Sequence, residues 1–192
     1  EQVDKVDEIK HPVVRTVFNE NNIFEPYDVN VMSEMPANSG LGSSSAFTVG
    51  LLKLVLSKKK EPITKLDLAL EAIRVERDLL KENVGIQDQL HCSFGGLNRF
   101  DFDEKNIKLT PIVMRGECQS RLLGSLYLVY TGIRSHASKV LESQIEKTSK
   151  GAVDGYLKEM YAMVSEGEKI LTNSSVNELV PELSKLLNES WL

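Results

Sequence analysis

The pattern of apolar and polar positions divides the chain into helical and extended segments. Alternation of apolar and polar residues predicts strands at 27–34, 97–102 and 107–113, and a more continuous apolar run predicts a buried strand at 126–130. Apolar residues at three- and four-residue spacing predict helices over 8–21, 43–57, 153–171 and 181–192, one from Thr64 to a break near Asn83 and Gly85, and one after Ser135. Residues 103–106 are expected to join strands 97–102 and 107–113 as a hairpin.

The segment from Met35 to Ala46 separates the strand 27–34 from the helix 43–57. It holds two glycines and four serines, so it can turn tightly and expose backbone N–H groups at a helix start. The first N–H groups of a helix lack internal partners and lie at the positive end of its dipole, which predicts an anion cradle, most plausibly for phosphate. The alternative is a turn whose serines only cap the helix.

Composition and charge narrow the function classes. The chain has 192 residues, of which 41% are hydrophobic and 27% charged, and its net charge of −5 argues against a nucleic-acid partner but allows a local phosphate site. Cys92 and Cys118 form no metal-binding spacing and are interpreted as reduced, buried thiols. With no apolar run of about 20 residues and no signal peptide, we expect a cytoplasmic protein without a membrane partner.

Glu76 lies on the apolar stripe of the helix that begins at Thr64. The stripe is predicted to comprise Leu66, Ala69, Leu70, Ile73 and Leu80. A carboxylate on such a face is costly unless it meets a cation or hydrogen-bond donors. Two interpretations stay open: an ion pair with Arg74 or Arg77, or a ligand to Mg²⁺, which proteins hold with one or two oxygens beside substrate phosphates.

The run Pro36–Ser45 resembles the Pro-x-x-x-Gly-Leu-Gly-Ser-Ser-Ser/Ala signature of the GHMP small-molecule kinases at all ten positions. In that family the loop wraps the phosphates of ATP. The resemblance therefore implies a nucleotide site made by Pro36, Asn38, Ser39, Gly40, Leu41, Gly42, Ser43, Ser44 and Ser45. It also implies that Glu76 and Ser44 hold Mg²⁺.

A second resemblance concerns the segment Gly85-Ile86-Gln87-Asp88-Gln89. It is similar to Gly-Ile-Met-Asp-Gln of galactokinases and to its equivalent in heptose-phosphate kinases, with Gln87 in place of Met. In these kinases the aspartate contacts the hydroxyl that receives phosphate, so Asp88 is the implied catalytic residue, whereas on spacing alone it is a turn or cap residue. Gly85 and Gln87 are candidate substrate contacts beside Asp88.

Two further segments resemble the same kinases. Phe94-Gly95-Gly96 matches the Phe-Gly-Gly segment of the family, and Tyr130-Thr131-Gly132-Ile133-Arg134 resembles heptose-kinase-like members. Arg134 is accordingly a candidate substrate contact. The alternative is an exposed arginine at a helix start.

The family resemblance also implies a fold and a division into domains. The fold class is α+β: residues 1–118 would be the second part of a ribosomal-S5-like N-terminal domain, and residues 119–192 the start of a helix-rich, ferredoxin-like C-terminal domain. Members of the family are longer at both ends. We find neither their early substrate motif nor their late Gly-rich motif, and we expect the chain to be a central fragment of such a kinase.

The function implied by these resemblances is ATP-dependent phosphorylation of a sugar. The combination of motifs is most like kinases that phosphorylate the anomeric hydroxyl of D-glycero-D-manno-heptose 7-phosphate, giving the 1,7-bisphosphate in nucleotide-heptose biosynthesis for surface polysaccharide. Galactokinase-like or fucokinase-like activity is an alternative. So is a non-catalytic relative that senses sugar and nucleotide, or an inactive fragment.

Overall fold

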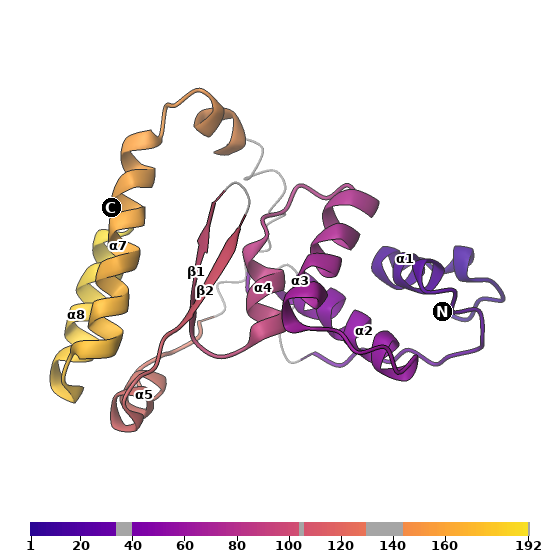
Figure 1. The fold of residues 1–192 in the computed structure, drawn as a ribbon, viewed down its shortest axis with the longest axis horizontal. Helices are drawn as coiled ribbons and strands as arrows, with labels where there is room; N and C mark the ends of the chain where they lie inside the picture. Colours follow the sequence, from indigo (N-terminus) through magenta and orange to yellow (C-terminus); the bar gives the residue numbers. More distant parts are fainter. Residues whose placement is uncertain (34–39, 104–105, 130–143, 192) are drawn as a thin grey trace. The chain divides into compact units, whose positions relative to one another are not determined.

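The computed structural model describes residues 1–33, 40–103, 106–129 and 144–191 (Figure 1). The described residues mix helices with one two-stranded antiparallel sheet, which agrees with the α+β class. They fall into two compact units, which we call unit 1 (residues 1–95) and unit 2 (residues 96–129 and 144–191). The assignment of residues 1–118 and 119–192 to two kinase domains stays a prediction.

Unit 1 is made of helices. Its elements are η1 (Val6–Glu8), α1 (Pro12–Glu20), α2 (Ser43–Lys58), α3 (Lys65–Ile73), the π-helical turn η2 (Arg74–Leu79) and α4 (Gln87–Phe94). Pro12 occupies the first turn of α1, and Thr64, the predicted helix start, caps α3 by accepting a hydrogen bond from the Asp67 N–H. The core joins α1, α2, α3 and η2 through Val13, Val14, Val17, Phe18, Val49, Leu51, Leu52, Val55, Leu68, Ala72 and Val75.

The buried face of α3 differs in part from the predicted stripe. Leu66 and Leu70 are 38% and 45% exposed, so their assignment to the core is wrong. The buried face instead comprises Leu68, Ala69, Ala72, Val75 and Glu76. The small alanines allow close packing of α3 against α2 and α4, and η2 then carries Glu76 inward, as predicted.

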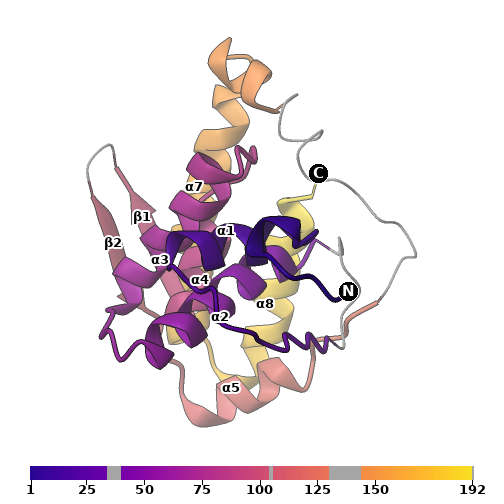
Figure 2. The same cartoon turned by 90° about the vertical axis from the view of Figure 1, so that its right-hand side faces the viewer.

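Unit 2 contains the sheet. Strands β1 (Asn98–Phe102) and β2 (Ile107–Pro111) pair antiparallel with Phe100 opposite Leu109, which confirms the predicted hairpin (Figure 2). Its helices include α5 (Gly116–Leu123), α7 (Asp154–Asn173) and α8 (Val176–Glu189), and residues 144–149 are helical as well. Helix α8 starts before the predicted position because Ser175 and Glu178 form a capping box. The core of this unit joins α5, α7 and α8 through Cys118, Ile170, Leu179 and Leu186.

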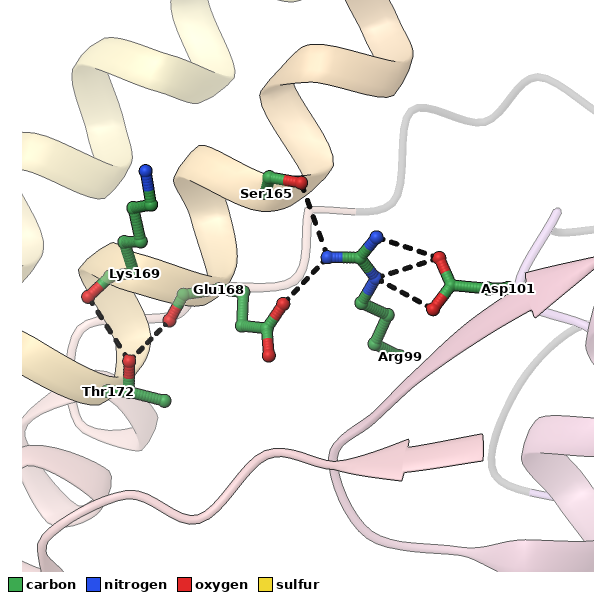
Figure 3. Close-up of polar contacts among 6 residues, drawn as sticks. All are labelled: Arg99, Asp101, Ser165, Glu168, Lys169 and Thr172. Atoms are coloured by element: carbon green, nitrogen blue, oxygen red, sulfur yellow. Dashed lines mark hydrogen bonds and ion pairs between the residues drawn. The ribbon is translucent and has the colours of Figure 1, made fainter. Parts of the chain in front are cut away.

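Arg99 of β1 connects the hairpin to α7 (Figure 3). Its guanidinium lies 2.7 Å from a carboxylate oxygen of Asp101 and 2.7 Å from one of Glu168, and it also donates to the Ser165 hydroxyl at 3.3 Å. The hydrogen bonds to Asp101 and, next, to Glu168 raise the pKa of Arg99. We call Arg99, Asp101, Ser165 and Glu168 the Arg99 network.

Two predicted strands are not formed in the described residues. Residues 27–33 and 126–129 have no regular secondary structure, and Val31 and Tyr127 are 60% and 87% exposed. Strands need backbone partners in a neighbouring strand, and in the described residues only β1 and β2 pair. Residues 34 and 130, and Ser135 with the start of its expected helix, lie outside the described residues. No helix in the described part of the chain is long and apolar enough to cross a bilayer.

Candidate active site

The start of α2 combines left-handed backbone with an uncapped helix end. Gly40 has φ +76° and Gly42, the N-cap residue, has φ +68°, a region that only glycine adopts without strain. Glycine at the N-cap offers no side-chain acceptor to the first N–H groups of α2, and Ser43 to Ser45 lie inside the helix. The prediction that serines occupy the capping positions of this helix is therefore wrong for these three residues.

Asp88 lies directly against this helix start. A Cβ atom placed on Gly42 would be 3.3 Å from both Cγ and Oδ2 of the Asp88 side chain. Asp88 stands in the first turn of α4, which packs against α2. A carboxylate at this place is favoured by the positive end of the α2 dipole. The structure thus brings the predicted catalytic residue to the end of the predicted phosphate loop.

Glu76 is buried in contact with two polar side chains. The Ser45 hydroxyl donates to its Oε2 at 3.0 Å, and the Gln89 amide nitrogen donates to the same oxygen. Glu76 and Gln89 are each 1% exposed and Ser45 is 5% exposed. The other carboxylate oxygen of Glu76, Oε1, is buried without a hydrogen-bond partner. We call Ser45, Glu76 and Gln89 the Glu76 cluster.

The ion-pair interpretation of Glu76 is wrong for Arg74. The Arg74 guanidinium lies 2.7 Å from Glu20 and 2.8 Å from Glu71, and hydrogen bonds to Glu71 and then Glu20 raise its pKa. Arg77 is exposed, and no ion pair in the described part of the chain includes Glu76. The buried charge of Glu76 is balanced by hydrogen-bond donors on one oxygen only.

The pKa values of Glu82 and Cys92 reflect the negative charge around Glu76. Burial raises the pKa of the Glu82 carboxyl, and the charge of Glu76 raises it further. Cys92 is exposed rather than buried as predicted, but partial desolvation still raises the pKa of its thiol, and the charges of Asp88 and Glu76 add to the effect. A cation placed here would be stabilised by the same charges.

The residues fit one hard divalent cation. The unpartnered Oε1 of Glu76 is an oxygen ligand of the kind that Mg²⁺ prefers. In the described residues no group of three or more His, Cys, Asp or Glu side chains could hold a metal by itself. A cation bound to Glu76 would therefore take its other ligands from substrate phosphates and water, which is the usual manner of Mg²⁺.

The remaining predicted site residues lie apart from these contacts or outside the described residues. Ser44, which the prediction pairs with Glu76, is exposed, and Ser45 makes the contact instead. Gly85 and Gln87 are exposed beside Asp88, and Ser43 and Leu41 flank Gly42. Pro36, Asn38, Ser39 and Arg134 are outside the described residues.

Gln89 is the site residue that the sequence interpretation missed. It ends the segment Gly85–Gln89, but the resemblance to the sugar kinases implies no role for it. Its contact with Glu76 depends on how α4 packs against η2 and α2, which residue spacing does not reveal. The sequence feature that could have revealed this role is the position of Gln89 beside the apolar Leu90. A glutamine that is buried with such a neighbour requires a polar partner.

Comparison with known proteins gives a match to the part of the chain that carries these residues. Residues 8–96 match the sequence profile of the GHMP kinases N terminal domain, and this range contains Gly42, Glu76, Asp88 and Gln89. The chain is 27% identical over 166 residues to D-glycero-alpha-D-manno-heptose 7-phosphate kinase of Campylobacter jejuni, a match that covers 86% of this chain and 48% of that protein. The chain thus spans about half the length of this relative. Residues 8–96 are therefore similar to the N-terminal domain of the GHMP kinases, and the chain over most of its length is similar to a heptose 7-phosphate kinase.

Proposed function

We propose that the protein carrying these residues is an ATP-dependent sugar kinase that acts in the cytoplasm. Its substrate is D-glycero-D-manno-heptose 7-phosphate, whose anomeric hydroxyl it phosphorylates to the 1,7-bisphosphate in nucleotide-heptose biosynthesis. The observation that carries the proposal is the Asp88 carboxylate against Gly42, at the uncapped start of α2. The family match and the printed activity of the Campylobacter relative support it.

The phosphates of ATP bind at the loop 36–45 and the start of α2. Backbone N–H groups there have no side-chain acceptor at the N-cap, and the helix dipole favours negative charge. Left-handed glycines at 40 and 42 let the backbone approach the phosphates closely. This binding is mostly a matter of position and charge, as phosphoryl transfer requires.

Glu76 would hold the magnesium ion, with a serine of the loop as the second protein ligand. The sequence motif assigns that partner to Ser44, whereas Ser45 is the hydroxyl already bound to Glu76. When bound, Mg²⁺ neutralises charge that develops on the transferred phosphoryl group. The buried and uncompensated charge of Glu76 is retained in the fold for this cation.

Asp88 acts on the sugar hydroxyl. The hydroxyl oxygen attacks the γ-phosphorus, a new P–O bond forms, and the bond from the γ-phosphorus to the β,γ-bridging oxygen breaks to release ADP. Asp88 orients the hydroxyl or takes its proton, which is otherwise released to water. Gly85 and Gln87 lie next to Asp88 in the chain and contact the sugar, and Arg134 contributes its charge to the sugar phosphate.

The experiment is a coupled ATP-consumption assay of the protein carrying these residues against a panel of sugars. The panel holds galactose, fucose, an unphosphorylated heptose and heptose 7-phosphate. We expect turnover with heptose 7-phosphate above the others. Turnover only with galactose or fucose would reject the heptose substrate but keep the kinase, and MgATP binding without any turnover would favour a non-catalytic relative.

A further inference from the structure

Gln89 is a buried polar side chain for which packing alone gives no reason. It is 1% exposed on α4, and the next residue, Leu90, is fully buried. An amide at such a position is less favourable than an aliphatic side chain unless its polar atoms form hydrogen bonds. The use that the structure shows is the hydrogen bond from Nε2 to Oε2 of Glu76.

Both donors of the Glu76 cluster act on one oxygen. Ser45 reaches Oε2 from α2 and Gln89 reaches it from α4, so donors on two helices fix the rotation of the carboxylate. A carboxylate can accept about four hydrogen bonds over its two oxygens. With two donors on Oε2, the free lone pairs lie mainly on the buried Oε1, which has no partner.

The amide of Gln89 adds a second unused acceptor. Its NH₂ group must face Glu76, because the opposite orientation would place a carbonyl oxygen against a carboxylate. The amide oxygen, Oε1 of Gln89, is then buried without a partner as well. The cluster thus contains two buried acceptor oxygens that receive no hydrogen bond, and a cation with its bound water would satisfy both.

We propose that Gln89 is a positioning residue, which together with Ser45 holds Oε2 of Glu76 so that Oε1 faces the divalent cation that accompanies ATP. This inference rests on the proposed function, because the cation arrives with the nucleotide. Gln89 acts through Glu76 and does not touch the reacting atoms. Partners that orient metal ligands typically change metal affinity ten- to hundredfold when removed.

The test compares ATP affinity with and without Mg²⁺, measured by calorimetry. The variant Gln89→Met keeps the length of the side chain and removes its donor. We expect the gain in ATP affinity caused by Mg²⁺ to fall about tenfold, while ATP binding without Mg²⁺ stays unchanged. Ser93→Ala is the matched control: it removes a buried, unpartnered hydroxyl one turn along α4, and it should change neither value.

A second parent protein, the variant Glu76→Gln, separates a positioning role of Gln89 from a role in packing alone. In Glu76→Gln, where the carboxylate is absent, Gln89→Met should produce no further loss, because coupled residues are not additive. An equal loss in both backgrounds, or an unchanged Mg²⁺ effect in a folded Gln89→Met chain, overturns the inference alone. The variants are made in the complete protein that carries these residues, and failure of that unaltered protein to bind MgATP overturns the proposed function and this inference with it. If circular dichroism shows Gln89→Met unfolded, Gln89→Asn, one methylene shorter, gives the same readout.

Discussion

The two compact units differ in how completely a partly or wholly buried charge is paired with polar groups of the chain. In unit 2 the Arg99 guanidinium meets Asp101, Glu168 and the Ser165 hydroxyl, so its donors are used within the chain (Figure 3). In unit 1 the Glu76 carboxylate meets donors on one oxygen only, and the other stays without a partner. A charge that is paired internally serves the fold, whereas a buried charge left incomplete is an unfavourable feature that a ligand can offset.

The largest expected effect concerns Asp88 in unit 1. Asp88→Asn keeps the shape of the side chain but removes the charge that orients or deprotonates the acceptor hydroxyl. We expect turnover of the complete enzyme to fall by about 10²- to 10⁴-fold, with ATP binding retained. In unit 2, Asp101→Asn should leave turnover unchanged at temperatures where the protein is folded. Equal turnover of Asp88→Asn and the unaltered enzyme would remove Asp88 from the mechanism.

A second prediction separates backbone strain from contact with Asp88. Alanine in a left-handed conformation costs about 1–2 kcal/mol, so Gly40→Ala and Gly42→Ala should both lower the free energy of unfolding in urea. Gly42→Ala should lower it more, because its Cβ would lie 3.3 Å from the Asp88 carboxylate, whereas a Cβ on Gly40 meets nothing within 4 Å. Equal losses would show that Asp88 does not rest against Gly42 in solution.

A third prediction compares the contributions of the Glu76 and Glu168 carboxylates to stability. Without nucleotide or Mg²⁺, Glu76→Gln should not lower the midpoint of thermal unfolding, because the neutral amide avoids burying an incompletely bound charge. Glu168→Gln breaks an ion pair of the Arg99 network, and we expect it to lower the midpoint by about 2–4 °C. Circular dichroism measures both, and a clear loss of stability in Glu76→Gln alone would reverse the contrast between the units.

The smallest expected effect concerns the Cys92 thiol. Because partial desolvation and the charges of Asp88 and Glu76 raise its pKa, the reactive thiolate forms only at higher pH than in an unperturbed cysteine. Asp88→Asn removes one of these charges, lowers the pKa, and should increase the alkylation rate by iodoacetamide at neutral pH about two- to threefold. Cys118 is 2% exposed and should not react in the folded chain, and the exposed Asp154→Asn serves as the control.

Local features of the fold could be predicted from the sequence. The Thr64 cap depends only on its own turn, and the hairpin of β1 and β2 depends on two adjacent alternating runs, so both were confirmed. The spacing along the helix correctly predicted that Glu76 lies on a buried face, although it did not predict the π-helical turn η2 that carries Glu76 inward. The prediction of strands was wrong for residues 27–33 and 126–129. Alternation describes where side chains point, whereas a strand also requires hydrogen bonds to a neighbouring strand, which alternation does not reveal.

The candidate site could be predicted only in outline. Motif order along the chain indicated the loop, Glu76 and Asp88, but contacts between helices decide which atoms meet. In the structure Ser45 and Gln89 donate hydrogen bonds to Glu76. The motif had indicated Ser44 as the partner of Glu76 and had indicated no role for Gln89. The π-helical turn η2, which has no recognised signature in residue spacing, is the element that carries Glu76 inward.

The most direct test of the account is calorimetric titration of MgATP into the unaltered chain and into Glu76→Gln. The account holds that Oε1 of Glu76 completes a cation site beside the phosphates. It predicts binding to the unaltered chain and an affinity at least about tenfold lower for Glu76→Gln, with the Mg²⁺-free affinity of the two chains alike. Equal affinity of the two chains for MgATP would contradict it.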